Sequence, residues 1–383
     1  MRLIDPDPRV DARHRRLLWQ VLQRLGKFRD PSTSKSRQSV QSHVAPAVAR
    51  LLGRGSTPDH QRAKQDLVDQ LGSRRKLHAN LLQSAALGLG QLLLPGEDLP
   101  ADAESGKALW RHYDTTRDQQ TRHFILIAAG QIGGETNFER VAREFRTGKR
   151  EIQAWAALSL GLMAFHAPKV KPQAGAQGPV KDVRAMTGLL LHGGLLRINN
   201  RDVRAAIALG LGLCGHKAAA ADMRRLLEKY RRVEEFAGYL CMGLALMDDK
   251  AAGAQIQAVM GDSSRRPLLM SQAALALGRL RHPGASTTLR ALLQTGGVFG
   301  TLTLASTATA MGYLADPKNV APLIRILGDT GHNSLVRAFA AVALGSMAEN
   351  DPLTWSAWVA MNMNYSAAAE TLSNGSSGIL DIL

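Results

Sequence analysis

The run Ala208-Leu209-Gly210-Leu211-Gly212-Leu213-Cys214 contains one copy of a motif that recurs along the chain. The motif is an apolar residue, a glycine, any residue and a second apolar residue, within alanine- and leucine-rich sequence. Successive motif glycines are 40, 31, 51, 31, 35, 34 and 33 residues apart. A period near 33 residues is typical of repeat proteins, and the two long intervals predict insertions. The eight glycines are Gly90, Gly130, Gly161, Gly212, Gly243, Gly278, Gly312 and Gly345.

Each glycine lies on one face of a predicted helix. Apolar residues at positions −4, −1 and +2 from the glycine share that face at helical spacing. A glycine inside a helix costs about 0.5–1 kcal/mol relative to alanine. Eight such glycines at one position therefore indicate a recurrent close approach of a second helix. The residues at −4 are Ala86, Leu126, Ala157, Ala208, Tyr239, Ala274, Ala308 and Ala341.

Helix breaks follow the motif, and a second helical stretch follows each break. Asp316-Pro317 and His282-Pro283 are examples of the breaks, since proline stops a helix. The second stretches include residues 219–230, 285–293 and 320–327. Each repeat is thus predicted to be an antiparallel pair, an A helix followed by a B helix that carries the glycine. We expect an all-α, right-handed α-solenoid of about eight pairs, with a helical N-terminal cap and an irregular C-terminal tail.

Residues 75–350 resemble the HEAT-repeat family, close to its bacterial short-repeat branch. The resemblance rests on Val203-Arg204-Ala205-Ala206 and Val336-Arg337-Ala338-Phe339, which look like the family's second-helix opening. It implies that Asp202 pairs with the arginine eight residues before the glycine. Arg122 repeats this arginine, whereas other repeats carry Leu82, Gln153, Glu235, Met270 and Leu304 in the slot.

Three regions are predicted. Residues 1–81 form a basic helical cap region, with helices over 8–28, 39–53, 58–71 and 74–93, the last of which runs on into the array. Residues 82–350 form the repeat array, and residues 166–181 are a proline- and lysine-containing loop insertion within it. Residues 351–383 form a tail that either caps the last repeat, through Trp355 and Trp358, or docks elsewhere.

Positive charge gathers in two parts of the chain. Residues 1–81 hold 17 basic and 7 acidic side chains, and residues 151–235 hold 13 and 7. An uneven distribution of this kind favours an acidic partner, although solvated charge and a tolerated insertion explain the same residues. The candidate partner-binding residues are those of the basic front, the loop and the apolar C-terminus, namely Arg13, Arg16, Arg74, Arg75, Lys76, Lys169, Lys171, Ile379, Leu380, Ile382 and Leu383.

Catalytic and metal-binding motifs are not found. Some HEAT-like proteins are enzymes, and the deoxyhypusine hydroxylases hold two irons with His-Glu dyads, but none of the 11 histidines here precedes a glutamate. Asp114 or Asp118 beside Trp110 could mimic the acid of HEAT-like glycosylases, although Trp110 fits a core position better. Cys214 and Cys241 are expected to be buried free thiols. We expect no cofactor, no metal, no catalytic residue and no enzyme activity.

The sequence therefore predicts a non-catalytic scaffold for protein–protein interaction, a structural or assembly subunit whose partners have acidic surfaces. The alternative is a nucleic-acid-binding array that uses its basic N-terminal half on phosphates. An aromatic content of only 5% argues against base stacking on single strands. No membrane span and no signal peptide are visible, which favours a cytoplasmic location.

Overall fold

The computed structural model describes residues 20, 41–42, 44–73, 77–96, 98–167, 182–263, 265–294 and 300–348. Within these residues the chain forms seventeen α-helices and several short 3₁₀ turns, with no β-strand. It divides into two compact units, residues 1–184 and residues 185–383. The predicted all-α array of helix pairs is confirmed. The three-region division stays a prediction.

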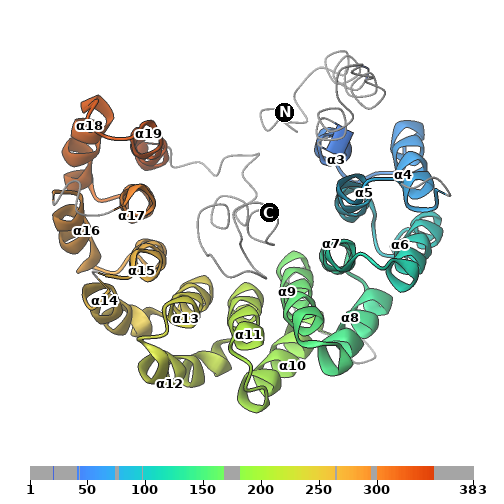
Figure 1. The fold of residues 1–383 in the computed structure, drawn as a ribbon, viewed down its shortest axis with the longest axis horizontal. Helices are drawn as coiled ribbons and strands as arrows, with labels where there is room; N and C mark the ends of the chain where they lie inside the picture. Colours follow the sequence, from blue (N-terminus) through green and yellow to red (C-terminus); the bar gives the residue numbers. More distant parts are fainter. Residues whose placement is uncertain are drawn as a thin grey trace, which may run out of the picture. The chain divides into compact units, whose positions relative to one another are not determined.

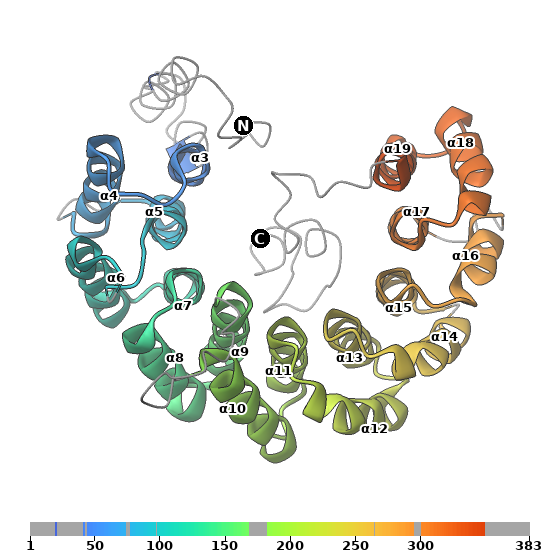
Figure 2. The same cartoon turned by 180° about the vertical axis from the view of Figure 1, so that it is seen from behind.

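The first unit begins with the single helix α3 and continues with three A–B pairs. Figure 1 shows the A helices in one row and the B helices in a second row, and the reverse view in Figure 2 agrees. Along the B row, α3 packs on α5, α5 on α7 and α7 on α9. The helices are α3 (Val44–Leu52), α4 (Pro58–Leu71), α5 (Ala79–Leu92), α6 (Ala103–Thr115), α7 (Gln119–Ile132), α8 (Glu135–Thr147) and α9 (Arg150–His166).

The second unit repeats the arrangement with five pairs. Its B helices α11, α13, α15, α17 and α19 pack in that order, each on the next. The first A helix starts two residues before the unit boundary. The helices are α10 (Val183–Arg197), α11 (Arg201–Cys214), α12 (Ala220–Tyr230), α13 (Glu234–Leu246), α14 (Gly253–Gly261), α15 (Pro267–Leu280), α16 (Ala285–Gln294), α17 (Thr301–Leu314), α18 (Val320–Gly328) and α19 (Ser334–Ala348).

The repeat glycines lie where neighbouring B helices meet. A Cβ atom on Gly130 would lie 2.5 Å from the carbonyl oxygen of Ser159, and one on Gly278 would lie 2.6 Å from that of Ala310. Real Cβ atoms do not come so close to backbone, so only glycine permits this packing. Six motif glycines meet the adjacent B helix in this way: Gly90, Gly130, Gly212, Gly243, Gly278 and Gly312.

A second small residue completes the contact. Gly90, Gly130, Gly278 and Gly312 each face the residue two positions before the next motif glycine. That residue is small in every repeat, which the sequence analysis did not use. In the pair α11–α13 the register differs, and Gly212 faces Gly243 itself. The residues at −2 are Gly88, Ala128, Ser159, Gly210, Cys241, Ala276, Ala310 and Ala343.

In three repeats the residue eight positions before the glycine joins a B helix to its own A helix. Arg204 Nε donates to the carbonyl oxygen of Leu195 at 3.2 Å, near the end of α10. Arg337 Nε donates to that of Leu327 at 2.9 Å. Gln153, in the same slot, donates to that of Phe145 at 3.1 Å. These bonds satisfy carbonyls that a helix end leaves without a partner.

The implied ion pair between Asp202 and Arg204 is not formed. Asp202 is exposed, and its carboxylate makes no recorded contact, whereas Arg204 is nearly buried and bonds to the end of α10. The second bond of this guanidinium, at 3.3 Å, goes to Asn199 Oδ1 in the turn. The arginine therefore closes a helix end here instead of binding the turn acid.

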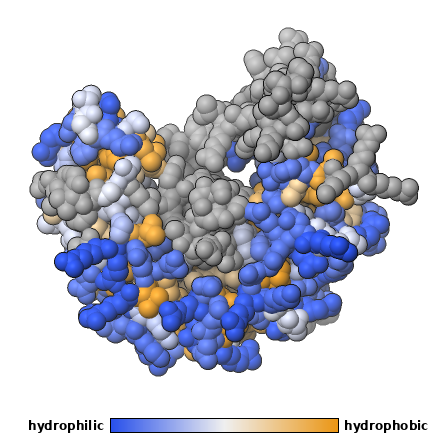
Figure 3. Space-filling model, in the orientation of Figure 1, coloured by the Kyte–Doolittle hydropathy of each residue, from blue (hydrophilic) through white to orange (hydrophobic). Residues whose placement is uncertain are grey.

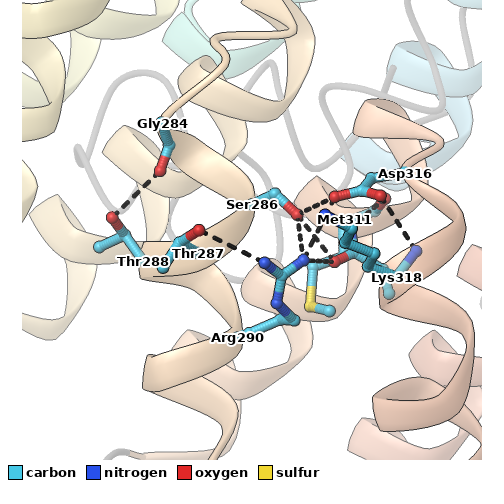
Figure 4. A network of polar contacts seen from close by, with 9 residues as sticks. Gly284, Ser286, Thr287, Thr288, Arg290, Met311, Asp316 and Lys318 are labelled. Carbon is cyan, nitrogen blue, oxygen red and sulfur yellow. Dashed lines mark hydrogen bonds and ion pairs between the residues drawn. The ribbon is translucent and has the colours of Figure 1, made fainter.

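Polar side chains link successive helix pairs along the row of A helices. Around Asp316, Figure 4 shows one such network, in which Arg290 NH1 of α16 lies 3.2 Å from Asp316 Oδ2 and 3.1 Å from Asn319 Oδ1. Ser286 Oγ lies 3.0 Å from the same Asn319 oxygen. His192 of α10 binds Asp222 of α12 at 2.8 Å in a similar way. Polar contacts thus join neighbouring A helices, whereas close backbone contacts join neighbouring B helices.

The predictions for Cys214, Cys241 and Trp110 are confirmed. Both cysteines are buried and form no disulfide, and burial raises the pKa of the Cys241 thiol to about 12. Trp110 is a core residue of α6: its side chain is buried, and Nε1 donates to Asn137 Oδ1 at 2.8 Å. Asp114 binds Arg140, an arginine whose guanidinium lies over the Trp110 ring.

Gly278→Ala should lower the free energy of unfolding by about 1–3 kcal/mol, because the new Cβ has to push α17 away from α15. The matched control is Gly106→Ala in α6, where a Cβ would meet nothing within 4 Å. That change should stabilise the protein by about 0.5–1 kcal/mol through helix propensity alone. Urea unfolding of both variants checks the pair. A stabilising effect at Gly278 would contradict the proposed contact.

Candidate interaction surface

The eleven residues predicted to bind a partner are not placed by the structure. Each of them lies outside the described residues, so the predictions for the basic front, the loop lysines and the apolar C-terminus stay predictions. The described residues therefore have to supply a candidate site of their own.

Within the described ranges, no group of three or more histidine, cysteine, aspartate or glutamate side chains could hold a metal ion. In the same ranges no helix is both long and apolar enough to cross a bilayer. Among the described side chains, two clusters contain a buried or half-buried histidine, one in each unit.

The first cluster is a histidine stacked on a tryptophan between α7 and α9. The ring planes of His123 and Trp155 are 8° apart and their centroids are separated by 4.7 Å. Burial lowers the pKa of His123 to about 4, although Asp118 opposes this shift. Both His123 Nε2 and Trp155 Nε1 are buried without a hydrogen-bond partner. A neutral, stacked imidazole of this kind is a packing element at neutral pH.

The second cluster joins α10, the end of α11 and α12. His192 binds Asp222, and the rings of His192 and His216 meet edge to face at 5.4 Å. The bond from His192 lowers the pKa of Asp222. Gly188 makes room for His216, since a Cβ there would lie 2.3 Å from His216 Nδ1. This cluster fixes one side of α10 and leaves the opposite side open.

The open side of α10 is an apolar stripe. The exposed fractions of Met186, Leu189 and Leu196 are 37%, 68% and 57%. With Gly193 these residues have spacings of 3, 4 and 3, the pattern by which one helix packs along another. The other side of the helix is buried through Thr187, Gly188, Leu191, Gly194 and Leu195. We call Met186, Leu189, Gly193 and Leu196 the α10 seam.

This stripe departs from the pattern of A helices that expose charge, such as α8 and α12. Arg184 and Arg197 enclose twelve residues of α10 without an acidic or basic side chain other than His192. By contrast, α8 exposes Glu139, Arg143 and Arg146. Hydrophilic residues likewise cover most of the visible surface over the outer helices in Figure 3, with small hydrophobic patches between them. An apolar stripe on such a surface indicates a contact site.

Arginine side chains lie at the end of the seam and on the neighbouring helices. Arg197 is exposed, and its Nε donates to the carbonyl oxygen of Gly193 at 3.1 Å, which holds its side chain along the seam. Arg201 begins the next helix and is exposed as well. On α12, Arg225 pairs with Asp222 but keeps 78% of its side chain exposed. The arrangement suits a partner whose apolar face has acidic flanks.

Sequence reasoning did not find the seam, because buried and exposed leucines adjoin in the run Leu189-Leu190-Leu191 and again at Leu195-Leu196. From its sequence, an apolar helix of this kind is expected to be buried in the core. The available signal was the lack of charge on an A helix, directly after the insertion.

Comparisons with known proteins give matches among solved structures. No family model matches the chain, and no curated protein matches it. Among solved structures, human deoxyhypusine hydroxylase in complex with glycerol matches 88% of this chain and 99% of its own, with 18% identity and a TM-score of 0.31. At these values we transfer no residue role from it. The chain is a helical-repeat protein, and its likeness to the HEAT family remains a resemblance.

One expectation from the sequence is corrected by this match. We expected the chain not to be an enzyme, whereas the matched protein is a hydroxylase. A repeat array of this type therefore does not exclude catalysis, and the expectation is withdrawn.

The stacked histidine predicts acid sensitivity. In the unfolded chain a histidine has a pKa near 6.5, whereas His123 in the folded protein has one of about 4. Between these values the unfolded chain binds the proton and the folded chain does not. Stability is therefore complete above pH 6.5 and falls as the pH drops towards 4, by up to roughly 3 kcal/mol for this residue.

His123→Phe keeps a ring on Trp155 and should flatten the stability profile between pH 6.5 and 4, measured by urea unfolding at each pH. His78→Gln changes an exposed histidine and is the control. If His123→Phe loses stability with acid as steeply as the wild type, the buried imidazole is not the cause.

Proposed function

We propose that this chain is a helical-repeat binding protein whose α10 seam holds an α-helical segment of a partner protein. The observation that carries the proposal is the exposed stripe of Met186, Leu189 and Leu196, in a helix row where α8 and α12 expose charged side chains. The scaffold role expected from the sequence fits this surface.

The shape of the seam supports a helix as ligand. Spacings of 3, 4 and 3 follow one side of a helix, and a partner helix with a similar stripe can lie along it. At Gly193 a Cβ would meet no group except the Arg197 guanidinium, at 3.3 Å. The Arg197 guanidinium therefore lies at the middle of the seam, where it can meet a carboxylate of the partner.

The charges support an acidic partner. No carboxylate lies on α10 itself, while Arg197, Arg201 and Arg225 stand at or near its ends and side. Arginine binds carboxylates as a two-pronged donor. Acidic residues beside the partner's apolar stripe would steer it to the seam and set its direction.

Fluorescence anisotropy with two labelled amphipathic helices tests the proposal. Both peptides carry the same leucine stripe, one with glutamate flanks and one with lysine flanks. The wild-type protein should bind the glutamate peptide and discriminate against the lysine peptide. Leu189→Glu should weaken binding at least about tenfold, since burying a leucine contributes about 1.5–3 kcal/mol.

The matched control is Ile324→Glu on α18, because Ile324 is similarly exposed at 55% and the change in charge is the same. This variant should bind like the wild type. Equal loss from both substitutions, or no discrimination between the peptides, would contradict the seam. Salt-sensitive binding of duplex DNA that survives Leu189→Glu, without peptide binding, would instead favour the nucleic-acid alternative.

A further inference from the structure

On the last B helix, α19, the space beside the motif glycine is empty, whereas an adjacent B helix fills that space at the six motif glycines named above. A Cβ on Gly345 of α19 would meet nothing within 4 Å, whereas one on Gly312 of α17 would lie 3.0 Å from the Cα of Ala343. Gly345 holds the position at which a motif glycine meets the next B helix. Among the described residues, no helix follows α19 to make that contact.

The exposure of side chains along α19 also shows that no described helix covers this face. The residue four before the glycine is fully buried in the preceding repeats, with Ala208, Ala274 and Ala308 each at 0% exposure. In α19 the equivalent Ala341 is exposed. Its neighbour Val342 is 61% exposed, and Leu335 is 49% exposed. An uncovered face of this kind on a terminal repeat is unfavourable in water.

This face has a defined shape. Leu335, Ala338, Val342 and Gly345 have spacings of 3, 4 and 3 on one side of α19, and all four are exposed. The row includes two small residues, Ala338 and Gly345. It is thus suited to a segment that brings large apolar side chains against small ones. We call these four residues the α19 face.

The sequence that follows α19 has the matching composition. It continues from residue 349 to residue 383, which lie outside the described residues. Asp351-Pro352 repeats Asp316-Pro317, the pair at which Asp316 accepts a bond from the Lys318 amide at 3.0 Å and α18 follows. Trp355, Trp358 and Met361 then recur at intervals of three residues.

We propose that the segment 351–372 of the same chain covers the α19 face and closes the array. The segment is joined to α19 directly, so its local concentration at the face exceeds that of any free partner. Its tryptophans supply the bulk that Ala338, Ala341 and Gly345 lack. The proposal is independent of the α10 seam.

Thiol reactivity in the full chain tests the proposal. Val342→Cys places a thiol on the α19 face, and Leu189→Cys places one on the α10 seam, where exposure is 68%. The two native cysteines are buried and give a low background. With a maleimide reagent, Val342→Cys should react at least tenfold more slowly than Leu189→Cys.

Replacing Trp355 and Trp358 by serine should then raise the rate at Val342→Cys towards that at Leu189→Cys and leave the latter rate unchanged. The unchanged Leu189→Cys rate and the far-ultraviolet circular dichroism show that the array is still folded. Protection has to be the same in dilute and concentrated protein.

Three results overturn the proposal. The first is equal reactivity of the two thiols in the full chain, which means that the face is open. The second is protection that the tryptophan substitutions do not relieve. The third is protection that grows with protein concentration, which assigns the face to a second copy of the chain.

Discussion

A carbonyl oxygen of one B helix lies where the β-carbon of its neighbour would otherwise be. At Gly130, Gly212 and Gly278 this separation would be 2.5–2.6 Å, so neighbouring backbones are in direct contact. The contact also explains the small residues at −2, which face the motif glycine of the preceding B helix in four pairs. Each glycine costs helix propensity, and the close packing of the B row offsets that cost. The sequence motif recurs about every 33 residues because each B helix makes this contact with the next B helix.

The A helices are joined in a different way. Their outward surfaces are solvated, and they are linked by hydrogen bonds and ion pairs such as Arg290 to Asp316 and His192 to Asp222. Within a pair, the slot of Arg204, Gln153 and Arg337 ties the end of the A helix to the B helix. Arginine and glutamine can each donate this hydrogen bond, because the acceptor is a backbone carbonyl oxygen that a long side chain can reach. The motif thus tolerates variation in this slot but not at the glycine.

Much of the fold could be predicted from the sequence. The stretches 58–71, 219–230 and 285–293 match α4, α12 and α16 within one or two residues, and proline or glycine marks both ends of α4 and the start of α16. The role of Asp202 could not be predicted, because the spacing that suggests an ion pair also suits a bond from Arg204 to a carbonyl. The α10 seam was missed for a similar reason. In an apolar helix, periodicity does not tell a buried leucine such as Leu191 from an exposed one such as Leu189.

Both proposed contacts, at α10 and at α19, follow from the same rule. Most faces of these helices are covered by the next element or carry polar side chains, whereas the α10 seam and the α19 face are exposed and apolar. The rule depends on the B helices meeting at the glycines, and a double-mutant cycle between Gly278 and Ala310 tests that most directly. Gly278→Ala and Ala310→Val each enlarge the same contact, so the account predicts a coupling energy between about 0.5 and 3 kcal/mol, with Ala310→Gly relieving part of the damage from Gly278→Ala. Unfolding free energies that simply add, within about 0.5 kcal/mol, would contradict it.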